Sequence, residues 1–243
     1  MRTYGLIGKT LGYSFSKSFF ERYFSENEID AQFVNFELAA IEDMNRVFEQ
    51  QIGGLSVTIP YKESIIPFLD DLSIEAKVIG AVNCIQFKDG LKVGHNTDAY
   101  GFQQSIKPFL TNQHERALIF GTGGASKAIA YVLKNLGIDV LFISQDPKGD
   151  KLFSYAEVNN HMLNACKLLV NCTPVGTLDY KDSKFDLPFE YLTPDHLVVD
   201  LVYNPPMTDL LLKSKQQGAT ILNGESMLKH QALQSWKIWN NQL

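Results

Sequence analysis

The chain has 243 residues, of which 45% are hydrophobic and 20% are charged, and this composition predicts one large folded domain or two modest ones. The formal net charge of −5 and the scattered lysines and arginines exclude a broad basic surface for nucleic acid or for anionic membranes. Three cysteines without metal-ligand spacing indicate reduced thiols and no metal site. Without a signal-peptide pattern or a long apolar run, we expect a soluble, cytoplasmic protein.

The first predicted unit is a strand at residues 3–8, followed by a helix with four aromatic residues between positions 19 and 24. Ser14, Ser16 and Ser18 lie at the start of this helix, and one of them would serve as its N-cap. Two further hydroxyls beside a helix N-terminus could instead donate hydrogen bonds to a carboxylate. The residues alone support the two interpretations equally.

A second strand at 31–38 and an amphipathic helix at 41–51 form another βα unit, and a third strand runs from 55 to 59. Pro60 ends this strand and places Lys62 at the carboxyl edge of the predicted sheet. Open α/β sheets bind ligands at that edge. The alternative is an ordinary solvated lysine in a first helical turn.

An apolar strand at 80–87 is interrupted by Asn83, and the Asp-Gly pair that follows it predicts a hairpin turn. A buried amide needs hydrogen-bond partners, so Asn83 is either structural or directed at a ligand. Asn96, Thr97 and Asp98 have the composition of a turn and helix cap. A capping role would explain Asp98 without any chemistry.

The stretch LIFGTGGAS, at residues 118–126, is typical of a strand, a tight turn and the start of a helix. Gly121, Gly123 and Gly124 permit a sharp turn and a close backbone approach to a ligand, and Ser126 is small enough for helix packing. Free N–H groups at the helix start suit a pyrophosphate, so the motif predicts a dinucleotide site. The alternative is a glycine-rich connection that binds nothing. Ser126 weakens the match to the motif, because the usual pattern has glycine or alanine at this position.

Between Tyr100 and Arg116 a polar stretch marks the change to a second domain. Beyond it, apolar strands alternate with helical segments, which predicts a doubly wound α/β sheet. The last segment is an amphipathic helix on whose apolar face Gln231 is the odd polar residue. Its amide is either exposed to solvent or directed into a binding cleft.

Taken together, these stretches resemble the shikimate dehydrogenase family, in consistent order from Tyr4 to Trp239. The segments that carry the resemblance are YSFS, SVTIPYK, GAVN, GHNTDAYGF, GTGGAS, NCTPVGT, DLVYNPPMT and GESMLKHQ. The resemblance implies a two-lobed α/β fold, with an N-terminal substrate-binding catalytic domain at 1–100, completed by a helix at 224–243, and a Rossmann-like dinucleotide-binding domain at 101–223. It also implies the reversible NADP(H)-dependent reduction of 3-dehydroshikimate to shikimate in aromatic amino acid biosynthesis.

The resemblance assigns roles to single residues. Lys62 and Asp98 match the family's catalytic pair, in which a held ammonium stabilises and protonates the alkoxide that hydride delivery leaves on a ketone. Ser14 and Ser16 match the serines that hold the substrate carboxylate. The other substrate-binding positions are Thr58, Asn83, Tyr203 and Gln231. The cofactor-binding positions are Gly121, Thr122, Gly123, Gly124, Ala125, Ser126, Gln145, Lys148, Thr173, Val202 and Gly224.

The sequence departs from the family pattern at two places. Around the two serines, Tyr13 and Lys17 stand where the family usually has histidine and proline, so the walls of the carboxylate pocket change. After the second strand of the cofactor domain, NADP-dependent members carry Asn, Arg and Thr to bind the 2′-phosphate, whereas this chain has ISQDPKGDK. Asp146 suits the ribose diol of NAD, whereas Lys148 and Lys151 could neutralise a 2′-phosphate.

NADP is therefore the expected cofactor on the grounds of the resemblance, and NAD is the alternative. The expected partner is a small carbocyclic acid, with no nucleic acid and no membrane, and the protein is expected to be a monomer or a homodimer. One rival interpretation is an enzyme that oxidises quinate as well or instead. Another is a non-catalytic dinucleotide-binding regulatory protein on the same fold, because a fold alone does not carry an activity.

Overall fold

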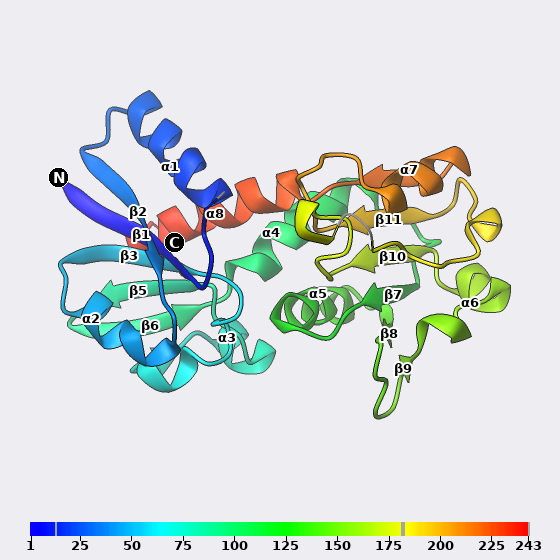
Figure 1. The fold of residues 1–243 in the computed structure, drawn as a ribbon, viewed down its shortest axis with the longest axis horizontal. Helices are drawn as coiled ribbons and strands as arrows, with labels where there is room; N and C mark the ends of the chain where they lie inside the picture. Colours follow the sequence, from blue (N-terminus) through cyan, green and yellow to red (C-terminus); the bar gives the residue numbers. More distant parts are fainter. Residues whose placement is uncertain (13, 181–182, 243) are drawn as a thin grey trace. The chain divides into compact units, whose positions relative to one another are not determined.

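The computed structural model describes residues 1–12, 14–180 and 183–242. The chain forms two compact units, which are Met1–Gly101 with Leu228–Leu243, and Phe102–Met227. We call them unit 1 and unit 2. Within the described residues, each unit is built around its own six-stranded sheet, and Figure 1 traces the chain through both.

Unit 1 has a mixed sheet with the strand order β2-β1-β3-β5-β6-β4. Its strands are β1 (Arg2–Gly8), β2 (Ala31–Glu37), β3 (Ile52–Val57), β4 (Asp71–Leu72), β5 (Cys84–Lys88) and β6 (Leu91–His95). Strands β2, β1 and β3 are parallel, whereas β5 is antiparallel to both β3 and β6. Because β2 and β3 lie on opposite sides of β1, the carboxyl ends of β1 and β3 form a topological switch point, where such sheets bind ligands.

Unit 1 has several short helical segments, one of which is shorter than the sequence pattern predicts. They are α1 (Phe15–Glu26), η1 (Ile41–Asp43), α2 (Met44–Phe48), η2 (Ile66–Phe68), α3 (Ile74–Ile79), the start of α4 (Thr97–Ile106) and most of α8 (Glu225–Trp239). The helix expected at 41–51 is a 3₁₀ turn followed by little more than one α-helical turn. The strand expected at 55–59 is β3, which ends at Val57, so Thr58 lies in the loop beyond the strand.

Strands β5 and β6 form the predicted hairpin. Asp89 and Gly90 have φ values of 52° and 79°, as a type I′ turn requires, and this turn matches the twist of the two strands. The predicted start of the first strand is wrong. Gly80, with φ 71°, ends α3 in a left-handed conformation, and β5 begins only at Cys84. Asn83 therefore precedes the strand and does not interrupt it.

Unit 1 buries apolar side chains on both faces of its sheet. Alternation along β1 directs Tyr4 and Leu6 to one face and Ile7 to the other. On the first face, aromatic side chains of α1 pack with those of α8, and the rings of Tyr4 and Trp239 have centroids 5.2 Å apart. The last helix of the chain is thus part of the core of unit 1.

Gly54 of β3 leaves the space in which the indole of Trp239 lies. A Cβ atom at position 54 would be 2.2 Å from the Trp239 ring, and this ring is 5% exposed and has no free space to move into. We expect Gly54→Ala to lower the free energy of unfolding by about 1–3 kcal/mol through overpacking. Chemical denaturation measures the change, and Gly12→Ala is the control, because nothing lies within 4 Å of its added Cβ. Equal effects of the two substitutions would contradict this packing.

Unit 2 has a fully parallel sheet with the strand order β12-β11-β10-β7-β8-β9. Its strands are β7 (Arg116–Phe120), β8 (Asp139–Ile143), β9 (Leu152–Phe153), β10 (Leu168–Asn171), β11 (Leu197–Asp200) and β12 (Thr220–Leu222). Numbered along unit 2 and read from β9, this is the order 3-2-1-4-5-6 of a Rossmann fold. The prediction of a doubly wound α/β sheet is confirmed.

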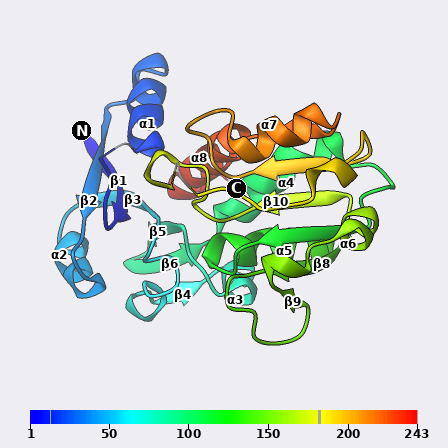
Figure 2. The same ribbon diagram turned by 45° about the vertical axis from the view of Figure 1, so that its right-hand side comes forward.

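Apart from one 3₁₀ turn that precedes β7, the helical segments of unit 2 connect these parallel strands (Figure 2). They are η3 (Lys107–Phe109), α5 (Gly124–Asn135), η4 (Tyr155–Glu157), α6 (Asn160–Ala165), η5 (Leu178–Tyr180), η6 (Phe189–Tyr191) and α7 (Asp209–Gln216). The crossovers run in opposite directions from β7, toward β8 and toward β10. Since such crossovers are right-handed, α5 and α7 cover opposite faces of the sheet. The switch point of unit 2 therefore lies between the carboxyl ends of β7 and β10.

Two of the three thiols are buried within these cores. Burial raises the pKa of Cys84 to about 12 and that of Cys166 to about 11, which keeps both protonated. Over the described ranges, no group of three or more His, Cys, Asp or Glu side chains could hold a metal ion. No helix in that part of the chain combines the length and the apolar character needed to cross a membrane.

Candidate active site

Lys62 and Asp98 form an ion pair in unit 1, with 2.5 Å between Nζ and Oδ2. Lys62 lies in the turn after β3, where its carbonyl accepts a hydrogen bond from the Val82 N–H. Asp98 is in the first turn of α4, where the helix dipole favours a carboxylate. The two side chains are only 16% and 8% exposed, so the alternative of a solvated lysine is wrong. The pair directs the ammonium group of Lys62 toward one fixed acceptor.

Asn83 connects Asp98 to the neighbouring Thr97. Its Nδ2 donates to Asp98 Oδ1 at 2.9 Å and to Thr97 Oγ1 at 3.0 Å, and its Oδ1 accepts from the Thr97 N–H at 2.6 Å. The amide is therefore satisfied within the protein. Since Asn83 binds one carboxylate oxygen of Asp98, the other oxygen is left to Lys62.

Asn96, and not Asp98, caps helix α4. Its Oδ1 accepts a hydrogen bond from the Ala99 N–H at 3.2 Å, and its Nδ2 donates to the Ala81 carbonyl at 2.9 Å. The interpretation of Asp98 as a capping residue is therefore wrong, because the nearby asparagine already takes that place. Asp98 keeps both carboxylate oxygens for side chains.

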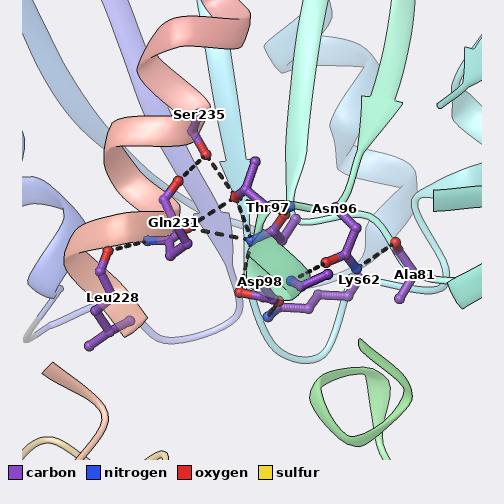
Figure 3. Close-up of polar contacts among 10 residues, drawn as sticks. Lys62, Ala81, Asn96, Thr97, Asp98, Leu228, Gln231 and Ser235 are labelled. Carbon is purple, nitrogen blue, oxygen red and sulfur yellow. Dashed lines mark hydrogen bonds and ion pairs between the residues drawn. The ribbon is translucent and has the colours of Figure 1, made fainter. Parts of the chain in front are cut away.

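Helix α8 contributes Gln231 and Ser235 to the same polar cluster (Figure 3). Gln231 is 6% exposed, which rules out the solvent-exposed alternative, and its Oε1 is 3.4 Å from both Asn83 Nδ2 and Thr97 Oγ1. The Ser235 hydroxyl is 3.0 Å from Thr97 Oγ1. Ser235 was not predicted, although its position four residues after Gln231 places both on one face of the helix.

The serines at the start of α1 differ in how they are used. Ser14 is the N-cap, and its Oγ accepts from the Lys17 N–H at 3.2 Å, which leaves its own O–H to donate. Ser18 donates to the Phe15 carbonyl at 3.0 Å. Ser16 is buried, and no hydrogen bond of its hydroxyl is found in the described part of the chain. Tyr13 lies outside the described residues.

Thr58 lies at the switch point of the unit 1 sheet. Its N–H donates to the Ile7 carbonyl at 2.8 Å, directly beyond the end of β3. A Cβ added to Gly8, the last residue of β1, would be 2.8 Å from Thr58 Cγ2. Thr58 thus stands beside the end of β1 and after the end of β3, in the place where the sheet binds ligands.

The predicted strand, turn and helix around GTGGAS are confirmed in unit 2. Gly121 follows β7 with φ 99°, which a side chain would strain, and Gly123 and Gly124 start α5. The N-cap residue of this helix, Gly123, has no side chain to cap it, which leaves its first N–H groups to other acceptors. Thr122 is exposed and Ala125 half-buried, whereas Ser126 is fully buried, with an Oγ that has no partner among the described residues.

Val202 and Gly224 lie next to each other in unit 2. The Gly224 N–H donates to the Val202 carbonyl at 3.2 Å, and a Cβ on Gly224 would be 2.1 Å from the Leu201 carbonyl oxygen, so only glycine fits there. Tyr203 follows Val202 and is half-buried. Tyr203 thus belongs to unit 2, whereas the other predicted substrate-binding residues belong to unit 1.

A cavity of about 680 Å³ opens at the carboxyl edge of the unit 2 sheet. Its lining includes Gly121 after β7, Gln145 after β8 and Thr173 after β10, three of the predicted cofactor-binding residues. Gly121 and Thr173 meet at the switch point, where a Cβ on the glycine would be 2.9 Å from Thr173 Cγ2. Tyr155 also lines the cavity, and burial raises the pKa of its phenol. Sequence reasoning missed Tyr155, which begins η4 directly after Ser154; the Ser154–Glu157 capping box there is a local signal for a helical turn but not for a binding site.

The predicted phosphate-binding lysines after β8 are both paired with acids. Lys148 Nζ is 2.7 Å from Asp146 Oδ2, and Lys151 Nζ is 2.7 Å from Asp139 Oδ1. Neither lysine lines the cavity. All four side chains are about half exposed or more, and such pairs contribute little to stability.

A buried carboxylate, Asp200, organises the backbone beside Thr173 and Val202. Asn171 receives hydrogen bonds from the Thr173 N–H and hydroxyl, at 2.8 and 2.7 Å, and donates to Asp200 Oδ1 at 2.8 Å. The Val202 N–H donates to the same oxygen, and the Thr208 hydroxyl donates to Oδ2 at 2.6 Å. Two predicted cofactor-binding segments are thus tied to one carboxylate.

Burial raises the pKa of Asp200 above its usual value, although three hydrogen bonds oppose the shift. The folded state therefore binds this proton more tightly than the unfolded state, so the contribution of Asp200 to stability falls as the pH rises from about 3.9 through the folded pKa. An asparagine at this position does not ionise, so its contribution to stability does not fall as the pH rises. We expect the free energy of unfolding of Asp200→Asn, minus that of the wild type, to rise with pH in urea titrations from pH 4 to 7. A difference independent of pH would contradict this assignment.

The comparisons with known proteins point to one family, and the relatives align with nearly the whole chain. The model of the shikimate dehydrogenase substrate binding domain matches residues 6–85. A shikimate dehydrogenase (NADP(+)) from Clostridium botulinum (strain 657 / Type Ba4) is 35% identical over 250 residues, which cover 98% of this chain and 96% of the relative. The enzyme of that name from Aquifex aeolicus (strain VF5) is 36% identical over 248 residues, or 98% and 90% of the two chains.

A solved structure shows the same fold. The crystal structure of shikimate 5-dehydrogenase from Thermus thermophilus, in complex with NADP(H) and shikimate, matches with a TM-score of 0.87 at 28% identity, over 99% of this chain and 94% of the other. Both units of this protein thus have the folds found in a nicotinamide-dependent oxidoreductase. The chain belongs to the shikimate dehydrogenase family.

Proposed function

We propose that this protein is an NADP-dependent shikimate dehydrogenase, which reversibly reduces 3-dehydroshikimate to shikimate in the biosynthesis of aromatic amino acids. The observation that carries the proposal is the Lys62–Asp98 pair, 2.5 Å long and largely buried, near the carboxyl edge of the unit 1 sheet. The relatives named shikimate dehydrogenase (NADP(+)), which align with nearly the whole chain, support the substrate and the cofactor.

Lys62 acts as the acid in reduction and as the base in oxidation. The nicotinamide cofactor supplies or accepts the hydride. When a ketone carbon receives a hydride, its oxygen becomes an alkoxide, and the proton on Lys62 Nζ stabilises and then neutralises it. Asp98 fixes the direction of Nζ, and Asn83 fixes Asp98 through the 2.9 Å bond to its second oxygen. The reverse reaction returns the proton to Nζ.

The substrate is bound by hydroxyls and amides of unit 1, with Tyr203 from unit 2. Ser14 and Ser16 donate to the substrate carboxylate, which the N-terminal end of α1 also favours. The ring hydroxyls are bound by Thr58, by Gln231 and by the side-chain oxygen of Asn83, since both Nδ2 hydrogens of Asn83 are used by Thr97 and Asp98. The existing hydrogen bonds of Asn83 and Gln231 support this role, because they fix the orientation of both amides before the substrate arrives.

Unit 2 holds the dinucleotide. The turn at Gly121 allows a close backbone approach to the pyrophosphate, but its own N–H already donates to the Ile143 carbonyl. The donors that suit the pyrophosphate are the N–H groups at the start of α5, those of Thr122, Gly123, Gly124, Ala125 and Ser126. Gln145 and Lys148 follow β8, where a Rossmann fold binds the adenosine ribose. Thr173 follows β10 at the switch point, and Val202 and Gly224 follow the next two strands, β11 and β12, along the same edge of the sheet. In this proposal, residues 1–100 with 224–243 are the catalytic domain and residues 101–223 the cofactor domain.

The protein is proposed to be cytoplasmic and to act as a monomer or homodimer on a small carbocyclic acid. The fully buried thiols of Cys84 and Cys166 are consistent with a reducing compartment. A biosynthetic dehydrogenase needs a soluble substrate and cofactor, and the cytoplasm supplies both.

An absorbance assay of nicotinamide reduction tests the function. Shikimate and quinate are each supplied with NADP and with NAD, and we expect the highest kcat/KM for shikimate with NADP. An efficiency at least tenfold higher with NAD would overturn the cofactor assignment, and one higher with quinate would overturn the substrate. Turnover in none of the four combinations would favour a non-catalytic dinucleotide-binding protein.

A further inference from the structure

The cavity of unit 2 shows where the adenosine ribose would lie. Ser144 and Gln145 line it directly after β8, the second strand of the Rossmann sheet. In this fold, the residues that follow the second strand bind the 2′-hydroxyl of NAD or accommodate the 2′-phosphate of NADP. A cation that binds the 2′-phosphate must therefore reach this end of the cavity.

The loop after β8 is poorly suited to supply that cation. Its basic residues, Lys148 and Lys151, are paired with Asp146 and Asp139 at 2.7 Å. The pairs are weak enough to open, but a phosphate that takes Lys148 leaves the carboxylate of Asp146 beside its own negative charge. Like charges at this distance repel, so the loop offers little net attraction.

Lys184 lines the same cavity from another segment, between η5 and η6. It is the one basic side chain in the lining, as far as the described residues go, and no ion pair of its ammonium is found among them. Phe185 is 5% exposed and packs against Phe120 and Tyr155, with ring centroids at 5.2 and 6.0 Å. This contact anchors the segment, so the backbone of Lys184 is fixed at the cavity.

The charge of the lining depends on Lys184. Asp186 is the acidic residue of the cavity in the part of the chain that the structure describes, and Lys184 balances it. Without Lys184, a phosphate would enter a cavity whose lining carries a net negative charge. With it, the phosphate meets an ammonium group that has no ion pair to any acid among the described residues.

We propose that Lys184 binds the adenosine 2′-phosphate and thereby selects NADP over NAD. The residue that binds the 2′-phosphate then belongs to the segment between β10 and β11, and not to the loop after β8. This inference rests on the proposed function, since it requires NADP as the cofactor. A single ammonium group acts here as a point charge on a dianionic phosphate, in place of a bidentate arginine.

Isothermal titration calorimetry with 2′,5′-ADP and 5′-AMP tests the inference without catalysis. The two probes differ in the 2′-phosphate, so the ratio of their Kd values isolates its contribution. We expect Lys184→Gln to raise the Kd for 2′,5′-ADP by about 10- to 100-fold, the effect of a lost hydrogen bond to a charged group. The Kd for 5′-AMP should change by less than about twofold. Lys184→Arg should retain most of the wild-type ratio. The control is Lys215→Gln, because this lysine is exposed in the last turn of α7 and does not line the cavity, and it should leave both Kd values within about twofold.

The outcomes separate this inference from the proposed function. If the wild type prefers 2′,5′-ADP and Lys184→Gln keeps that preference, the inference is overturned and the proposed function stands. The same holds if Lys148→Gln removes the preference and Lys184→Gln does not. If the wild type binds both probes with equal Kd, the proposed preference for NADP is overturned. The proposed role of Lys184 is then overturned as well.

Discussion

Lys62→Ala is expected to lower kcat by about 10²–10⁴-fold, the usual contribution of a positioned acid or base. The loss follows from the chemistry of the ketone, because the alkoxide would then have water in place of an ammonium group as its proton donor. Binding of NADP should be unchanged, since Lys62 belongs to unit 1 and the predicted cofactor residues belong to unit 2. Steady-state kinetics with shikimate give kcat, and calorimetry gives the Kd for NADP.

The chain provides a matched control for this substitution. Lys77 pairs with Asp71 at 2.9 Å in the same unit, but both side chains are more than half exposed. Lys77→Ala removes a paired lysine without touching the buried cluster, and its kcat should stay within about twofold, as for a surface ion pair of small energy. If Lys62→Ala retains near-normal turnover while cofactor binding is intact, Lys62 is not the proton donor.

Asp98→Asn is expected to lower kcat by about 10²-fold or more. An asparagine oxygen can still accept from Asn83, but its NH₂ group then faces the ammonium of Lys62, and two donors cannot share a hydrogen bond. Lys62 loses its fixed direction and its neighbouring charge. The measurement is kcat together with the thermal midpoint of unfolding, so that an unfolded variant is not taken for an inactive one.

A double substitution shows whether the two residues act together. If Lys62 and Asp98 form one catalytic unit, the double variant Lys62→Ala with Asp98→Asn should be about as slow as Lys62→Ala alone, because residues that act as a unit are not additive. Fully additive losses would mean that Asp98 contributes by another route. Asp71→Asn at the exposed pair is the control, with turnover expected to stay close to that of the wild type.

The regular parts of the fold could be predicted from the sequence because their signals are local. GTGGAS fixes a strand, a turn and a helix, and the Asp89–Gly90 pair fixes a hairpin, since both require backbone conformations that glycine adopts easily. The short α3 was not predicted, and the strand expected at 80–87 began too early. The left-handed end of α3 at Gly80 follows a helix of only 6 residues, which is too short for a clear period.

The site could be predicted only through the resemblance to a family. Lys62 and Asp98 lie 36 positions apart in the sequence, and nothing in their own segments indicates that their side chains meet. The contribution of Ser235 depends on how α8 packs on unit 1, and the pairing of Lys148 with Asp146 depends on side-chain conformations in a loop. Contacts of these kinds are set by tertiary structure, which local patterns do not contain.

Helix α8 belongs to the core of unit 1 but follows unit 2 in the sequence, so the core of unit 1 is completed only after unit 2 has been synthesised. Ala232, Ile238 and Trp239 close the core around Tyr4, Phe20 and Phe33, yet the ribosome makes them after the whole of unit 2. At about 5–20 residues per second, the N-terminal segment waits roughly 6–25 s for its last helix. Unit 2 can fold first, and the aromatic surface of β1 and α1 is exposed to chaperones and to other nascent chains during that interval.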